Sequence, residues 1–80
     1  MTDAQKKKPQ PGDKVVLAEI PPGLLKGLPM EDQQAIIEII GKAVLLNEYD
    51  DDGRAELQFT DMDGTIHLIY VSPHLIELVR

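Results

Sequence analysis

The sequence predicts a mainly β fold: a small five-stranded antiparallel barrel with one helix inserted after the first strand. Two Asp-Gly pairs, Asp52-Gly53 and Asp63-Gly64, divide the second half of the chain into three short, apolar-rich segments. Asp-Gly between such segments is a strong hairpin signal, because tight turns need a positive φ that these residues tolerate. Eighty residues suffice for one domain. Short antiparallel strands in this number usually close into a barrel, which hides the strand edges.

The first part of the chain predicts a tail and the first strand. Residues 1–12 are polar and rich in lysine and proline, so we expect a disordered tail there and a single domain over 13–80. Strand composition extends from Lys14 to Ile20. The run Pro21-Pro22-Gly23 ends it, because proline cannot donate a hydrogen bond to a β-ladder.

A helix of about three turns is expected over residues 30–40. Pro29 suits its first position, where a missing N–H costs little, and Gly41 is a typical stop. Carboxylates in the first turn favour the helix dipole. The isoleucines at 36, 37, 39 and 40 are β-branched and would also suit a strand. The start and stop signals and the helical spacing of three of these isoleucines favour the helix.

The remaining strands follow from the turns and from alternation. Residues 55–60 alternate cleanly between apolar and polar side chains, which predicts one dry face and one wet face. Residues 65–71 are largely apolar on both faces, which predicts a central strand. The remaining elements are expected as a strand at 42–49, a helical turn at 74–75 and a last strand at 76–79.

Three segments resemble small Src-homology-3-type barrels: GDKVVL at 12–17, ELQFTDMDGTIHLIYV at 56–71 and SPHLIELV at 72–79. More narrowly, they resemble short uncharacterised bacterial proteins with that barrel. The resemblance implies an SH3-like barrel over about 12–79, with residues 21–41 in place of the first long loop, and it contains no active-site motif. Signalling barrels of this type bind proline-rich peptides in an aromatic groove. This chain has no tryptophan and only three Tyr or Phe residues, so no such groove is expected.

Charge and composition exclude several partners. The net charge is −6, and the part from Pro9 onward carries −8, which repels phosphate backbones and argues against nucleic-acid binding. There is no cysteine, so neither disulfides nor thiolate metal ligands are available. No apolar run approaches the ~20 residues of a membrane helix, and the N-terminus lacks a signal peptide's apolar stretch. We expect a cytoplasmic protein of bacterial type, a monomer or weak homodimer, without a membrane partner.

The string at 59–66 resembles the nucleophile motif of haloacid-dehalogenase-type phosphatases, an apolar strand followed by Asp-x-Asp-Gly-Thr. The resemblance implies that Asp61 is the nucleophile and Asp63 the acid/base, with magnesium nearby. Those enzymes need a long parallel-sheet domain after the motif, and only 15 residues follow Thr65. The sequence therefore favours a hairpin turn here.

Metal sites find weak support. In the EF-hand register of the same string, Phe59 and Tyr70 occupy the first and last ligand positions, which require carboxylates. Glu48 and the aspartates at 50–52 concentrate charge that would hold a hard cation weakly, but a solvated acidic turn is favoured. His67 and His74 lack zinc-site spacing; His67 is expected to be half-buried and hydrogen-bonded. We expect no catalytic, cofactor or metal residues. The alternative is a divalent-metal-binding protein or metal-dependent hydrolase using the Asp-rich turns.

The favoured function is a small non-catalytic binding or accessory module that acts through protein contact. The apolar insert at 22–40 is the candidate surface, and two interpretations stay open: its side chains cap the core, or some remain exposed as a patch. A further hypothesis is mimicry of nucleic acid by the acidic surface, with an affinity for a basic partner that falls with salt. The candidate contact residues are Leu24, Leu25, Leu28, Met30, Ile36 and Ile37.

Overall fold

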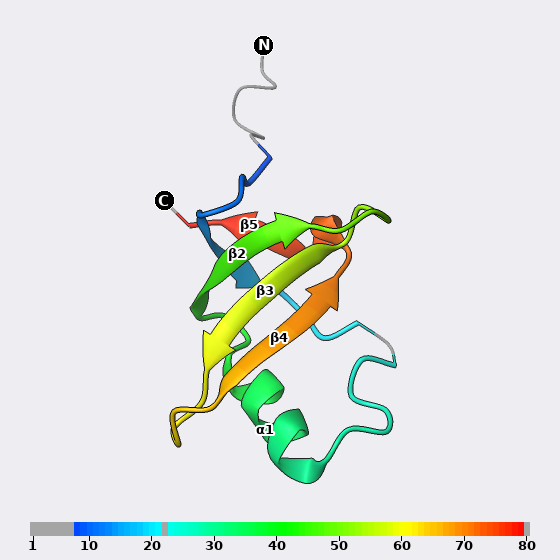
Figure 1. Cartoon of the computed structure of the whole chain (residues 1–80), viewed down its shortest axis with the longest axis vertical. Coiled ribbons are helices and arrows are strands. Elements are labelled where there is room, and N and C mark those ends of the chain that lie inside the picture. Colours follow the sequence, from blue (N-terminus) through cyan, green and yellow to red (C-terminus); the bar gives the residue numbers. More distant parts are fainter. Residues whose placement is uncertain (1–7, 22, 80) are drawn as a thin grey trace.

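The structure is a computed structural model that describes residues 8–21 and 23–79. Five antiparallel strands and one α-helix follow one another as predicted, with a single 3-10 turn before the last strand (Figure 1). The elements are β1 (Lys14–Leu17), α1 (Met30–Glu38), β2 (Ala43–Tyr49), β3 (Ala55–Thr60), β4 (Ile66–Val71), the 3-10 turn (Pro73–Leu75) and β5 (Ile76–Leu78).

The strands form one sheet in the order β4-β3-β2-β1-β5, so β2 is its centre and β4 is an edge. The prediction that the fourth strand is central is wrong. Its inner side chains, Ile69 and Val71, are buried in the core, but the apolar side chains on its outer face are exposed to solvent. No ladder joins β4 to β5 among the described residues, so the sheet is not closed into the predicted complete barrel.

The core lies on the inner face of the curled sheet, and α1 packs against one end of it (Figure 1). Alternate residues of the strands point into it, which is the period-2 pattern of a sheet with one buried face. The helix contributes Ala35, Ile36 and, just past its end, Ile39. The sheet's buried residues are Val15, Leu17, Val44, Leu46, Ala55, Leu57, Phe59, Ile69, Val71 and Ile76.

Helix α1 ends two residues earlier than expected, because its last turn tightens. Ile39 donates its N–H to the Ile36 carbonyl, a 3-10-type bond of the kind that often closes a helix. Gly41 then takes a φ of +82°, which suits glycine, and donates its N–H to the Leu17 carbonyl. That bond ties the end of the helix to β1. At the other end, Pro29 occupies the N-cap position and precedes the first helical residue, Met30.

Both hairpin turns lie where the Asp-Gly pairs predicted them, and both use the same construction. Asp50 donates its N–H to the Arg54 carbonyl, and Gly53 donates to the Asp50 carbonyl. Asp61, Gly64 and Thr65 repeat these two bonds, and each turn's glycine has a positive φ. No described residue other than glycine has a positive φ. The pattern is a type I turn followed by a left-handed glycine, a longer loop than a two-residue hairpin turn.

Lys8 and Pro9 contact the sheet, although they precede the expected boundary at Asp13. The Lys8 ammonium lies 4.3 Å above the centre of the Tyr49 ring, and the Tyr49 hydroxyl donates to the Pro9 carbonyl at 2.7 Å. Gly12 donates its N–H to the Leu46 carbonyl. The rest of the predicted tail, residues 1–7, lies outside the described residues.

Candidate protein-binding surface

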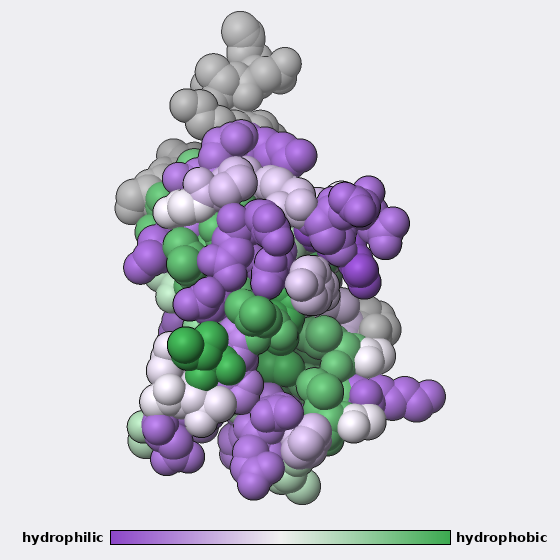
Figure 2. Space-filling view, viewed as in Figure 1, coloured by the Kyte–Doolittle hydropathy of each residue, from purple (hydrophilic) through white to green (hydrophobic). Residues whose placement is uncertain are grey.

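A row of three apolar side chains is exposed along edge strand β4. Ile66, Leu68 and Tyr70 keep 61%, 51% and 42% of their surface exposed, and their spacing of two residues places them on the same face of the strand. We call these three residues the β4 row. Figure 2 shows an apolar area over the part of the sheet that Figure 1 labels β4. Single exposed apolar residues are ordinary, but an aligned row on an edge strand is not.

The backbone of the same residues is also open. Asp61 donates its N–H to the Thr65 carbonyl, which fixes the phase of the β3–β4 ladder. Antiparallel ladders alternate bonded and non-bonded pairs, so residues 67, 69 and 71 bond to β3. The N–H and C=O groups of the β4 row point away from the sheet, and no backbone hydrogen bond from another described segment reaches them.

Acidic side chains lie at the Tyr70 end of the β4 row. Glu56 is buried and stands opposite Tyr70 on β4 and opposite Glu48 on β2. Like charges directly across a ladder destabilise it. The charge of Glu56, then partial burial, then the charge of Glu48, a hydrogen bond with Glu56 and the charge of Asp50 raise the pKa of Tyr70. We call Glu48, Asp50 and Glu56 the acidic end.

One cation lies beside this group. The Arg54 guanidinium is 5.4 Å from the centre of the Tyr70 ring. Its Nε donates to Asp50 at 2.8 Å, so Arg54 is paired with the turn. The acidic end therefore keeps an excess of negative charge.

His67 joins three elements at the other end of β4. Its Nε2 lies 2.8 Å from an oxygen of Asp61, and its Nδ1 lies 3.8 Å from Asp32 on α1. The ring stacks on Phe59 of β3, with centres 5.3 Å apart. The hydrogen bond with His67, followed by those from the N–H groups of the turn, lowers the pKa of Asp61. The predicted half-buried, hydrogen-bonded His67 is confirmed, and it ties the helix to the β3–β4 hairpin.

The aspartates of both turns are engaged in shaping them. One oxygen of Asp50 accepts hydrogen bonds from the N–H groups of Asp52 and Arg54, and Asp61 receives the same pair from Asp63 and Thr65. The phosphatase-like string is thus a hairpin turn, as the sequence favoured. Among residues 8–21 and 23–79, no group of three His, Asp or Glu side chains is placed to hold a metal ion.

His74 lies apart from His67 and from the β4 row. It sits on the 3-10 turn, where its Nδ1 lies 2.7 Å from the hydroxyl of Ser72. The turn position expected for it is confirmed.

Some of the insert residues predicted for contact pack against the core, and others are exposed. Leu24, Leu25 and Leu28 are half-buried against the core. Ile36 is 1% exposed and belongs to the core, so its prediction as a contact residue is corrected. Met30 and Ile37 remain exposed. Most of the insert's apolar excess therefore covers the small sheet, which leaves β4 as the longer exposed row.

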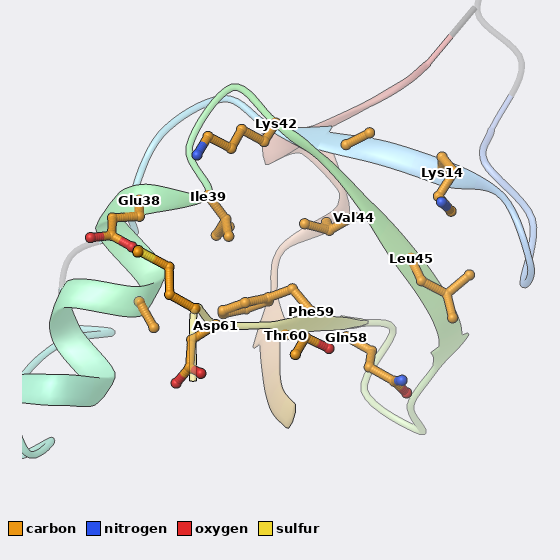
Figure 3. A pocket seen from close by; sticks show the side chains of 13 residues that line it. Lys14, Glu38, Ile39, Lys42, Val44, Leu45, Gln58, Phe59, Thr60 and Asp61 are labelled. Carbon is orange, nitrogen blue, oxygen red and sulfur yellow. The ribbon is translucent and has the colours of Figure 1, made fainter. Parts of the chain in front are cut away.

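A hollow of about 450 Å³ opens where β2 and β3 splay apart (Figure 3). Their ladder starts only at Leu45 and Gln58, so the segments beyond this pair diverge. The floor is apolar, and two lysines and two carboxylates stand among the lining residues. Charges of both signs therefore line the hollow. The charged lining residues are Lys14, Lys42, Glu38 and Asp61.

Comparisons with protein-family models, with curated proteins and with solved structures find no match to this chain. The site must therefore be interpreted from its own geometry. In the part of the chain that the structure describes, no helix is both long and apolar enough to span a membrane.

Proposed function

We propose that this protein is a small binding module that contacts another protein through the β4 row. The observation that carries the proposal is the alignment of Ile66, Leu68 and Tyr70, each about half exposed, on an edge strand. Burying such side chains contributes about 25 cal/mol per Å² of apolar surface, so a partner that covers the row gains directly from it. The contact needs no catalytic group.

The proposal includes a fold assignment. We infer that the five strands are an open form of a small Src-homology-3-type barrel, with α1 in the place of the first long loop. The strand order β4-β3-β2-β1-β5 and the 3-10 turn before β5 support this assignment. Function does not follow from such a fold, so the contact surface is argued from the β4 row alone.

The test uses two side chains of matched exposure. Leu68 on β4 is 51% exposed and Ile37 on α1 is 52% exposed. A photo-cross-linking amino acid is placed at 68 or at 37 in the source organism, and cross-linked proteins are identified and purified. Binding of the purified partner is then measured by calorimetry for the wild type, Leu68→Asp and Ile37→Asp.

We expect cross-linking at position 68, and an affinity at least about tenfold weaker for Leu68→Asp, because a carboxylate replaces buried apolar surface. Ile37→Asp should bind like the wild type. If only Ile37→Asp weakens binding, the contact surface is on α1 and the assignment to β4 is wrong. If neither position cross-links above background, the protein-binding function itself fails.

A further inference from the structure

We infer that the partner of the β4 row is an extended segment of another protein, which adds to β4 as a sixth strand and carries lysine or arginine at its ends. This inference rests on the proposed function and specifies the partner's chemistry. It joins three features of one strand: an open backbone edge, an exposed apolar row and acidic groups near both ends.

The edge of β4 lacks the usual protection against strand addition. Natural edges are blunted by proline, by lysine, by bulges or by being very short. β4 has six residues with no proline, glycine or lysine, and its register with β3 is regular throughout. The register shift of this sheet lies between β2 and β3 instead. The opposite edge strand, β5, is only three residues long, so it offers a much shorter template.

A strand added at this edge would satisfy both backbone and side chains. Its N–H and C=O groups would meet those of Ile66, Leu68 and Tyr70, which point outward. Every second side chain of the added strand would then lie beside the β4 row on the outer face. Main-chain bonds would supply affinity and the row would select apolar side chains, which is how strand addition recognises peptides.

Acidic groups near both ends of β4 favour basic residues at the two ends of the added strand. Glu56 and Glu48 lie one and two strands inward of Tyr70, on β3 and β2, and Arg54 is bound to Asp50, so a lysine or arginine near Tyr70 would be attracted by this negative charge. At the Ile66 end, Asp63 is exposed on the β3–β4 turn. A basic residue at each end of the segment therefore complements the surface.

A second copy of this chain fits the edge less well. In a two-fold antiparallel pairing of β4 with itself, Tyr70 of one copy would lie near Ile66 of the other, so the acidic end would approach the other copy's Asp63. The net charge of −6 adds general repulsion. A basic partner segment avoids this repulsion.

The test uses a synthetic peptide with an alternating valine–threonine centre and a Lys-Arg pair at each end. It is titrated into the full ¹⁵N-labelled chain at low salt. We expect saturable shifts at the amides of Ile66, Leu68 and Tyr70, slower exchange of those three amides, and weaker binding at high salt because screening reduces the attraction. A peptide with Glu-Asp ends should not bind.

The backbone contribution is tested by Leu68→Pro with Leu68→Val as its matched control. Proline removes the outward N–H but none that bonds to β3, a position that edge strands tolerate. We expect Leu68→Pro to bind the peptide about tenfold more weakly than Leu68→Val, since at least one hydrogen bond is lost and the ring obstructs the added strand. If Leu68→Pro does not fold, a peptide N-methylated at alternate residues tests the same bonds on the wild-type protein.

The inference is overturned if the peptide does not saturate at millimolar concentration, if acidic ends bind equally well, or if neither proline nor N-methylation weakens binding. These failures are distinct from failure of the proposed function. A natural partner that cross-links at position 68 but docks a helix would uphold the protein-binding function and reject strand addition.

Discussion

Asp61 organises the β3–β4 turn through both oxygens of its carboxylate. One carboxylate oxygen accepts two N–H groups of its own turn, and the other oxygen lies against His67. Asp50 shapes its turn in the same way and binds Arg54 instead. The recurring Asp-Gly pairs are thus only one part of the sequence pattern that forms these turns. The aspartate three residues before each glycine supplies the hydrogen bonds.

We predict that Asp61→Asn removes part of the acid sensitivity of folding. The pKa of Asp61 is lowered in the folded protein from an ordinary value of 3.8. Its contribution to stability is therefore present above that value and lost as the pH falls through the folded pKa. The difference in unfolding free energy between wild type and Asp61→Asn should be largest near pH 5 to 6 and should shrink toward pH 2.

Urea unfolding across that pH range measures the effect, with Asp63→Asn as the control on the same turn. Asp63 contributes its backbone N–H to the turn and no side-chain hydrogen bond among the described residues. A wild-type minus Asp61→Asn difference that stays constant from pH 6 to pH 2 would contradict the prediction.

We also predict that Gly64→Ala destabilises the protein by about 1 to 2 kcal/mol. Gly64 has a φ of +86°, and nothing lies within 4 Å of the Cβ position, so the cost comes from the backbone alone. Gly64→Asn should cost less, because asparagine tolerates the left-handed region. Thermal or urea unfolding of the two variants measures the difference. Equal stability of all three proteins would mean that the turn changes its conformation.

At the scale of elements, α1 serves chiefly to cover the sheet. Two neighbouring isoleucines allow the packed face of the helix to be compared with its exposed face, since Ile36 is 1% exposed and Ile37 is 52% exposed. We predict that Ile36→Ala costs about 2 to 5 kcal/mol, because it removes packed side-chain atoms and leaves a cavity. Ile37→Ala should change stability by less than about 0.5 kcal/mol. Urea unfolding compares the two, and equal losses would show that both faces of the helix are packed.

The elements also show what the sequence can and cannot predict. Hairpin turns and helix boundaries depend on local rules, and the structure reproduces them within a few residues. The alternation of β3 is reproduced in part, since its apolar face is buried as expected but Glu56 on the predicted wet face is buried too. The position of β4 in the sheet does not depend on local rules. A strand that is apolar on both faces suits the centre of a sheet and a binding edge equally well. Only the non-local order of strands distinguishes the two. The approach of Asp32 to His67 is non-local for the same reason.

For the whole molecule, the open sheet has a measurable consequence in the free protein. β2 lies at the centre with a neighbour on each side, while β4 pairs with β3 alone among the strands that the structure describes. The rate of amide hydrogen exchange should therefore alternate from one residue of β4 to the next. We predict slow exchange at His67, Ile69 and Val71, which bond to β3, and fast exchange at Ile66, Leu68 and Tyr70. The slowest amides should lie on β2.

This pattern, measured by NMR on the dilute free protein, distinguishes an open sheet from a closed barrel. Closure would bond the outward N–H groups of β4 and protect all six of its amides alike. Uniform protection would thus show that β4 has no free edge, which strand addition requires. The apolar row on the outer face would still be exposed. Alternating protection that becomes uniform only when the basic peptide is added would link the open edge of the free molecule directly to its occupation by a sixth strand.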